Sequence, residues 1–352
     1  MSDPAPDPAP RVSVVVRSYN RLPALCELLD VLLAQAHDGF EVIVVEQSTD
    51  VPAEAGARLA ALEADRRLRV IRSGPLGGPR ARNTGMQAAR GEVVVFVDDD
   101  DVPVGRDFLT KVEARFAADP RCLGLTCRHY WGDEETISGT YRWLARSRCM
   151  RFSRLLRLPT TYPRYDHAVD RVDYVHGTGG AYRRTVFERF GGWDEDTPIE
   201  DETSLGIRVS RGLAAGEYLC FDPTPRLRRR MDLGGGLAKR KAGAAGFYRR
   251  FMTFVHNILG RYHPTRVRAL YPLYVLAGWW WTCAWIFVDS HAHDTWWRRL
   301  AGAAAFTVTL PYHATRHLLK APFGRRPGSG EALATAGNGA PATPTAPRGA
   351  SA

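Results

Sequence analysis

Four consecutive carboxylates follow directly on an apolar run in this 352-residue chain. Residues 93–97 have the composition of a buried strand, and Asp98, Asp99, Asp100 and Asp101 come immediately after them. Adjacent like charges raise one another's pKa, so a fold holds them most readily when a cation or hydrogen-bond donors neutralise them. A hard divalent metal that carries a phosphate meets this need. The alternative is a solvated turn, because aspartate also favours turns.

The residues around this acidic run alternate between strand and helix patterns. Apolar runs predict strands at 11–17, 41–45, 69–72 and 93–97, with helices at 23–33, 53–64 and 81–89 between them. Such a βαβ repeat forms a predominantly parallel sheet with helices on both faces. The carboxyl ends of parallel strands meet at one edge, where α/β proteins bind their ligands. We therefore expect the polar residues that follow these strands to gather at that edge.

The side chains expected at this edge suit a nucleotide diphosphate. Glu46, Gln47 and Asp50 can bind a base or a ribose, and Arg80 or Arg82 can pair with a phosphate. The aspartates would hold Mg²⁺ or Mn²⁺, which would neutralise the charge that develops on a departing diphosphate. No Gly-x-Gly-x-x-Gly follows the first strand and no Gly-Lys-Ser/Thr phosphate loop is present, which argues against dinucleotide-binding and P-loop proteins.

Four motifs, taken in order, resemble those of the family 2 glycosyltransferases. They are Val12 to Arg21, Val44 to Asp50, Ala81 to Gly85 and Phe96 to Asp101. The resemblance covers about residues 10–255. It implies a GT-A fold, which is a Rossmann-like, mostly parallel α/β sheet flanked by helices. It also implies an inverting transfer of a sugar from a nucleotide diphosphate.

The resemblance also implies roles in the donor half. Glu46 stands where the family usually has an aspartate that contacts the base. Asp98 and Asp100 match the Asp-x-Asp pair, with Asp100 expected to bind the metal directly and Asp98 or Asp99 to face the ribose. The expected donor-binding residues are Tyr19, Asn20, Arg21, Glu46, Gln47, Arg82, Asn83, Asp98 and Asp99, and the expected metal ligands are Asp100 and Asp98.

A second group of motifs follows in the order that the family's acceptor half has. They are His176 to Arg184, Phe190 to Glu195 and Glu200 to Leu205. The resemblance implies that an acidic pair in the last motif supplies the base that deprotonates the acceptor hydroxyl.

Two alignments of that acidic pair are possible. Alignment through Leu205 selects Asp201 and Glu202, whereas alignment of the letters Glu-Asp selects Glu200 and Asp201. We therefore expect Asp201 to be the base, with Glu202 second, and burial can raise the pKa of such a group. The alternative is that these acids only favour the N-terminus of a helix at 203–211.

The other acceptor-side candidates are His176, Gly179, Gly180, Trp193 and Glu200. His176 can contact the diphosphate or the acceptor, or it can be structural. The glycines can serve unusual backbone angles. Trp193 can stack on a sugar or fill the core.

Composition and the resemblance together predict the domain organisation. The hydrophobic content of 45% is enough for one large domain with an appendage. We expect disorder at 1–10 and 323–352, a GT-A domain at 11–245 and a helical region at 246–322. Within the domain, 11–110 would be the nucleotide-binding half and 111–245 the acceptor half. The six cysteines have no Cys-x-x-Cys spacing, so reduced core thiols are expected and no zinc site.

Charge and hydropathy point to a membrane surface. The net charge is +10, with arginine-rich stretches at 142–157 and 226–241 that match no nucleic-acid-binding motif. An anionic membrane or a lipid diphosphate fits better, and solubility is the alternative. Residues 269–288 are uncharged and carry four tryptophans, and 300–314 is a shorter apolar stretch. Their length predicts membrane-associated helices, either spanning or interfacial. A buried helix or an oligomer contact is the alternative.

We interpret the chain as an inverting glycosyltransferase that acts on a lipid-linked glycan, a polysaccharide or a metabolite. A helix at 247–262 would lead to the membrane. Because the start of the chain lacks a basic and apolar signal sequence, we expect the catalytic part on the cytoplasmic face. One alternative is a synthase of polyprenyl-phosphate sugars, and another is a non-catalytic scaffold that binds nucleotide sugars.

Overall fold

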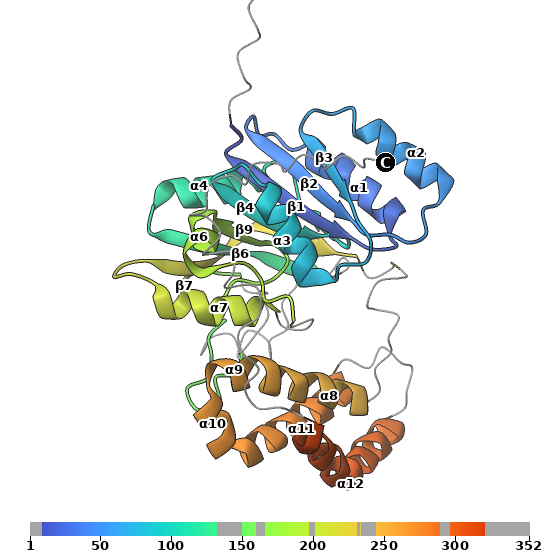
Figure 1. Ribbon diagram of the computed structural model, residues 1–352, viewed down its shortest axis with the longest axis vertical. Helices are drawn as coiled ribbons and strands as arrows, with labels where there is room; N and C mark the ends of the chain where they lie inside the picture. The colour runs from blue at the N-terminus through green and yellow to red at the C-terminus, as the bar shows by residue number, and fades with distance from the viewer. Residues whose placement is uncertain are drawn as a thin grey trace, which may run out of the picture.

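A computed structural model describes most of the chain between residues 9 and 320. The described residues are 9–131, 150–159, 166–196, 201–230, 233, 244–288 and 296–320. The predictions for Glu200, for much of both arginine-rich stretches, for Cys149 and for the two ends of the chain lie outside them. Figure 1 shows a sheet with helices against it and a separate layer of C-terminal helices.

Four parallel strands form the first half of the sheet. Their order is β3 (Leu68–Arg72), β2 (Phe40–Glu46), β1 (Val12–Ser18) and β4 (Val93–Asp98). In register, Val14 lies opposite Val42 on one side and Val95 on the other. The connecting helices are α1 (Leu22–Leu33), α2 (Ala53–Leu62) and α3 (Gly78–Ala88). The βαβ pattern predicted from the sequence is confirmed here, and the carboxyl ends of β1, β2 and β4 share one edge.

The second half of the sheet is mixed, so the prediction of a mostly parallel sheet is wrong there. β8 (Gly180–Arg183) runs antiparallel to both β4 and β6 (Cys122–Trp131). β9 (Tyr218–Arg229) is parallel to β6 and antiparallel to β5 (Asp101–Pro103) and β7 (Val169–Val172). The helices of this half are α4 (Phe108–Ala118), α6 (Thr185–Phe190) and α7 (Asp201–Gly212). An apolar run identifies a strand but carries little information about its direction, because direction depends on distant pairing partners.

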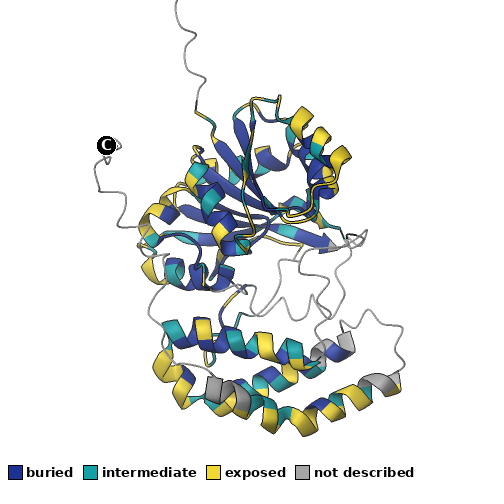
Figure 2. Cartoon of the chain, turned by 45° about the vertical axis from the view of Figure 1, so that its right-hand side comes forward, coloured by how far each residue is buried: buried dark blue, intermediate teal, exposed yellow. Residues whose placement is uncertain are grey.

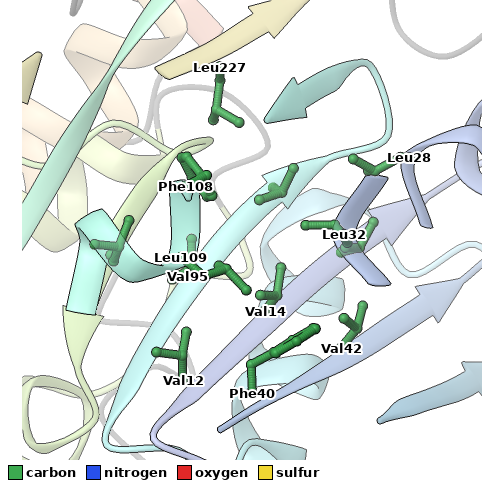
Figure 3. Close-up of a cluster of buried hydrophobic side chains, with 14 of the residues drawn as sticks. Val12, Val14, Leu28, Leu32, Phe40, Val42, Val95, Phe108, Leu109 and Leu227 are labelled. Carbon is green, nitrogen blue, oxygen red and sulfur yellow. The ribbon is translucent and has the colours of Figure 1, made fainter. Parts of the chain in front are cut away.

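Alternate residues of the central strands bury into two cores. Val12, Val14 and Val95 pack with α1 and α4 on one face, where Figure 3 shows them beside Leu28, Leu32 and Phe108. Val15, Phe96 and Trp193 belong to the core on the other face. This split follows from the two-residue period of a strand. Apolar packing on both faces of the sheet therefore fixes the position of these strands and of their carboxyl ends.

The C-terminal helices pack partly into the second core. They are α8 (Ala244–Phe254), a π-helical turn η2 (Val255–Leu259), α9 (Gly260–Tyr262), α10 (Pro264–Ala269), α11 (Tyr271–Val288) and α12 (Trp296–Lys320). The helix predicted at 247–262 is confirmed. Phe254, Ile258 and Leu259 pack into the same core as Trp193. Packing thus crosses the boundary expected near residue 245.

An ion-pair network also joins these helices to α7 and to the loop after α6. Asp194 accepts a hydrogen bond from the Tyr262 hydroxyl at 2.8 Å. Its carboxylate also lies 3.3 Å from Arg261 and 3.5 Å from Arg208 on α7. Within the described part of the chain, no helix combines the length and the hydropathy needed to cross a bilayer.

Replacing Leu259 by alanine should destabilise the whole domain. Leu259 is fully buried, so a cavity in the shared core should lower the free energy of unfolding by about 2 to 5 kcal/mol. Leu276→Ala is the matched control, because this leucine is 54% exposed and its loss should change stability by less than about 0.5 kcal/mol. Urea denaturation monitored by circular dichroism measures the free energy of unfolding of both variants and of the wild type. Equal effects would show that the burial of Leu259 in the shared core does not contribute to the stability of the domain.

Candidate functional site

A cavity of about 500 Å³ lies at the shared carboxyl edge of β1, β2 and β4. Its lining residues come from the ends of these strands, from the loop before α3 and from β9: Arg17, Ser18, Tyr19, Arg21, Gln47, Pro75, Gly77, Gly78, Asp98, Asp99, Asp100 and Arg229. The predicted gathering of polar residues at this edge is confirmed for six of the named candidates, which are Tyr19, Arg21, Gln47, Asp98, Asp99 and Asp100.

Two arginines from the first strand and its loop hold one side of the acidic run. Arg17 forms a two-pronged pair with Asp98, with Nε–Oδ1 at 2.6 Å and Nη2–Oδ2 at 2.8 Å. Arg21 Nη1 bridges Asp99 at 3.1 Å and Asp100 at 2.9 Å. Charge-assisted pairs of this kind are strong and directional.

A third arginine reaches the other side of the run from β9. Arg229 donates to both oxygens of Asp101, at 3.0 and 2.7 Å. Asp101 is fully buried and also accepts a hydrogen bond from Thr178 at 2.7 Å. Thr178 in turn accepts the backbone N–H of Asp98 at 3.1 Å. The neutralising groups that the sequence required are therefore, in large part, the chain's own guanidinium groups.

The pKa values of the four carboxyls diverge because their partners differ. Burial alone would raise the pKa of Asp98, but Arg17, Arg82 and Arg229 outweigh it and hold that pKa far below its usual range. Burial and the adjacent charge of Asp100 raise the pKa of Asp99 to about 6, against the opposing effects of Arg21 and Ser18. Burial and the charge of Asp101 raise the pKa of Asp100.

Three of the carboxylates could hold a metal ion together. Asp98, Asp100 and Asp101 each offer an oxygen, and these oxygens lie within 4.8 Å of one another. An all-oxygen set of this kind suits Mg²⁺ or Mn²⁺. The geometry brings together the two predicted ligands, Asp100 and Asp98, and adds Asp101. Asp101 was not assigned as a ligand from the sequence. Its side chain is held in place by Arg229 on β9, which lies 128 residues further along the chain.

Asp201 lies at the start of α7, behind the acidic run. It is 6% exposed, and Arg82 Nη1 donates to it at 2.5 Å. The same guanidinium lies 3.5 Å from Asp98. Burial would raise the pKa of Asp201, but the charges of Arg82 and Arg17 and hydrogen bonds with Glu202 and Arg82 hold it below its usual range. The expectation of a raised pKa is therefore wrong, because it left out the arginines.

Two donor-side candidates stabilise loops and do not line the cavity. Glu46 accepts the backbone N–H of Ser48 at 2.7 Å. Asn20 has a left-handed backbone, with φ of 54°, and its Oδ1 accepts the N–H of Thr49 at 2.9 Å. Both therefore fix the loops after β1 and β2. Gln47 has two roles. It lines the cavity, and its side-chain oxygen accepts the N–H of Leu76 at 2.9 Å, which holds the loop before α3.

Asn83 and Trp193 form a buried structural unit. The Asn83 amide donates to the Trp193 carbonyl at 2.9 Å and accepts the Trp193 N–H at 2.7 Å. The Trp193 ring is fully buried and packs edge-on against Phe96, with ring centroids 5.3 Å apart. Arg82 stacks on this ring at 4.9 Å. Of the two interpretations of Trp193, the core role holds here and the ring has no surface open to a sugar.

The remaining acceptor-side candidates shape the turn before β8. His176 Nδ1 lies 3.0 Å from the Thr178 carbonyl oxygen, and its ring contacts His129. Gly179 has φ of 62°, and a Cβ there would lie 2.3 Å from His129 Nε2. A Cβ on Gly180 would lie 2.1 Å from the His176 carbonyl oxygen. Both glycines are therefore required by close approach of the chain.

The site residues assigned from the sequence did not include Arg17, Ser18 or Arg229, and Asp101 was included only as a member of the acidic run. Arg17 and Ser18 lie within the first motif at the end of β1, and their place at the end of a strand was the available signal. The partner of Arg229 is far away in the sequence, so its role is visible only once β9 is placed beside β5.

Comparisons with known proteins agree with this geometry. The profile of the family described as glycosyl transferase family 2 matches residues 13–191. The uncharacterised glycosyltransferase EpsJ of Bacillus subtilis (strain 168) is 42% identical over 204 residues, 57% of this chain and 56% of EpsJ. The succinoglycan biosynthesis protein ExoO of Rhizobium meliloti (strain 1021) is 38% identical over 229 residues, 64% of this chain and 62% of ExoO. The chain thus spans about three fifths of the length of these relatives.

A solved structure supports the fold. The mannosyltransferase PcManGT from Pyrobaculum calidifontis, in complex with GDP-Man and Mn²⁺, matches with a TM-score of 0.52 and 22% identity. The match covers 90% of this chain and 88% of PcManGT. This likeness supports a GT-A-like α/β fold with a mixed sheet and flanking helices.

Replacing Asn83 by alanine should destabilise the protein. The change leaves the Trp193 N–H and C=O without their buried partner, which should lower the free energy of unfolding by about 2 to 4 kcal/mol. Thr84→Ala, on the same helix, is the control and should change it by less than about 0.5 kcal/mol, because Thr84 bonds only within its helix. Thermal melts measure both. An Asn83→Ala protein of normal stability that no longer binds nucleotide would instead support direct donor contact.

Proposed function

We propose that this chain, which belongs to glycosyl transferase family 2, moves a sugar from a nucleotide diphosphate to an acceptor hydroxyl with inversion at the anomeric carbon. The observation that carries the proposal is the cavity of about 500 Å³ whose wall contains Asp98, Asp99 and Asp100. Family membership favours this activity over that of a non-catalytic scaffold.

The donor would lie in this cavity with its diphosphate beside the acidic run. Asp100, Asp98 and Asp101 would hold Mg²⁺ or Mn²⁺, which supplies positive charge to the leaving diphosphate when bound. Arg17 and Arg21 add fixed positive charge to the same wall. Tyr19 is 40% exposed and lines the cavity, so its ring can stack on the base.

Asp201 would accept the acceptor proton in a single displacement. The acceptor oxygen forms a bond to the anomeric carbon while the bond to the diphosphate oxygen breaks and takes its electron pair with it. The proton passes from the acceptor oxygen to the Asp201 carboxylate. Its lowered pKa keeps Asp201 ionised, and transfer becomes favourable because the attacking hydroxyl turns acidic as the new bond forms.

The acceptor would be a polysaccharide or a lipid-linked glycan at an anionic membrane surface. The name of ExoO, a succinoglycan biosynthesis protein, supports a polysaccharide. On α11 the exposed Leu273, Leu276 and Trp280 share one helical face, as do Trp297, Val308 and Tyr312 on α12.

The outer sides of these helices suit the membrane–water interface. Figure 2 shows exposed residues along them. Residues 269–288 and 300–315 contain no charge, and exposed Arg249, Arg250, Arg266 and Arg268 lie on the preceding helices. Exposed tryptophan beside arginine is typical of proteins that rest on a membrane, where the catalytic part would face the cytoplasm.

Asp201→Asn and Asp100→Asn should separate chemistry from donor binding. Loss of the base should lower kcat about 10²- to 10⁴-fold while nucleotide binding is kept. Asp100→Asn should abolish metal-dependent stabilisation by nucleotide. Thermal shifts with UDP, dTDP and GDP, each with and without Mn²⁺, measure binding, and sugar release from the matching donor measures turnover.

Three results would argue against this assignment. Full turnover in Asp201→Asn would exclude it as the base. No thermal shift with any nucleotide and metal, in protein shown to be folded, would favour the scaffold interpretation. Transfer to a polyprenyl phosphate in place of a glycan would favour the alternative synthase.

Trp280→Gln combined with Trp297→Gln should weaken membrane binding. The two indoles are 66% and 75% exposed, and losing their burial in lipid should reduce binding to phosphatidylglycerol vesicles at least about tenfold. Val51→Gln, an exposed apolar residue beside the catalytic sheet, is the control. Vesicle flotation measures all three proteins. Equal flotation of the double variant, or no flotation of the wild type, would contradict the membrane surface.

A further inference from the structure

Arg229 occupies the space that a metal ion would need. Its Nη2 lies 2.7 Å from Asp101 Oδ2, 3.6 Å from Asp100 Oδ1 and 4.0 Å from Asp98 Oδ2. These are the same three residues whose carboxylate oxygens gather within 4.8 Å. One cationic nitrogen is therefore in reach of every ligand of the proposed metal.

The other arginines of the site are placed differently. Arg17 contacts Asp98 alone among these three residues, and Arg21 contacts Asp100 together with Asp99. Arg82 Nη2 lies 3.5 Å from Asp98 Oδ1, and Arg82 Nη1 pairs with Asp201. Among the described residues, only Arg229 spans all three carboxylates, and it also lines the donor cavity.

A metal and this guanidinium exclude one another. Mg²⁺ and Mn²⁺ bind carboxylate oxygens at about 2.1 Å, so an ion shared by the three residues would fall within repulsive distance of Nη2. Two like charges at such separation in a partly buried site repel strongly. The side chain of Arg229 must therefore turn away before the site can fill.

We propose that Arg229 is an internal counterion that holds the metal position in the metal-free protein and is displaced into the donor cavity when the metal binds. The proposal rests on the metal-dependent function above. Arg229 and Asp101 face each other across the β5–β9 pair, so the side chain can swing while the backbone pairing stays. Displacement puts a positive charge on the cavity wall, where a donor diphosphate can neutralise it. Metal binding and donor binding are thereby coupled through one positioning residue.

The test is the affinity for Mn²⁺ alone. In Arg229→Gln the competitor is gone, so Mn²⁺ should bind at least about tenfold more tightly than to the wild type. Arg229→Lys keeps the charge but loses the planar fork, so its affinity should lie between the two. Arg228→Gln removes the same charge from the adjacent, exposed position of β9 and should bind as the wild type does. Calorimetry on the full chain measures all four proteins.

The fold of each variant is checked by circular dichroism, because Arg229→Gln leaves the buried Asp101 without its cationic partner. An Arg229→Gln protein that folds only when Mn²⁺ is added supports the proposal, since the metal then replaces the missing cation. Mn²⁺ binding that is no tighter in either Arg229 variant than in the wild type overturns it. If the wild type binds Mn²⁺ but the Arg229 variants bind it no more tightly, only the Arg229 proposal fails and the metal-dependent function remains. If none of the proteins binds Mn²⁺, both proposals fail.

Discussion

The structure at the carboxyl ends of the central strands depends on ion pairs that neutralise buried aspartates with arginines. Five carboxyls, Asp98 to Asp101 and Asp201, meet four guanidiniums, those of Arg17, Arg21, Arg82 and Arg229. The cations come from β1, the loop after it, α3 and β9, so each ion pair joins a different element to the acidic run. Removing one partner of a buried pair costs more than the pair contributes, because it leaves a charge with no counterion. The five carboxyls outnumber the four guanidiniums that pair with them.

One turn of α3 connects the two halves of this site. Arg80 pairs with Glu195, Arg82 with Asp201, and Asn83 with the backbone of Trp193. The motif at Ala81 to Gly85 thus has a physical explanation that differs from direct donor contact. It holds the start of α7 and the turn around Trp193 at a fixed position relative to β4. A rigid support of this kind is what a catalytic group needs for accurate placement.

Sequence patterns predicted the parts of the molecule that local chemistry decides. The apolar runs of β1, β2 and β4 are buried on both faces, so composition alone identified them, and the place of Asp98 at a strand end located the cavity. Local patterns could not show that β8 runs antiparallel to β4, nor that Arg229 faces Asp101, because both depend on pairing over long sequence separations. The lowered pKa of Asp201 was missed for the same reason, since Arg82 lies 119 residues away.

The contacts of Asp194 join the C-terminal helices to the helix that begins with Asp201. Asp194 joins Tyr262 and Arg261 of α9 to Arg208 of α7, and α7 begins with Asp201. The surface helices that follow α9 and the carboxylate of Asp201 are therefore connected through short, directional bonds and a shared core. Val267 of α10 and Tyr274 of α11 belong to that core together with Leu205 of α7, so packing fixes the position of these helices relative to Asp201. Under the proposed function, an acceptor anchored on these helices would have to extend its hydroxyl across that fixed distance, so its reach as well as its chemistry would decide whether it is used.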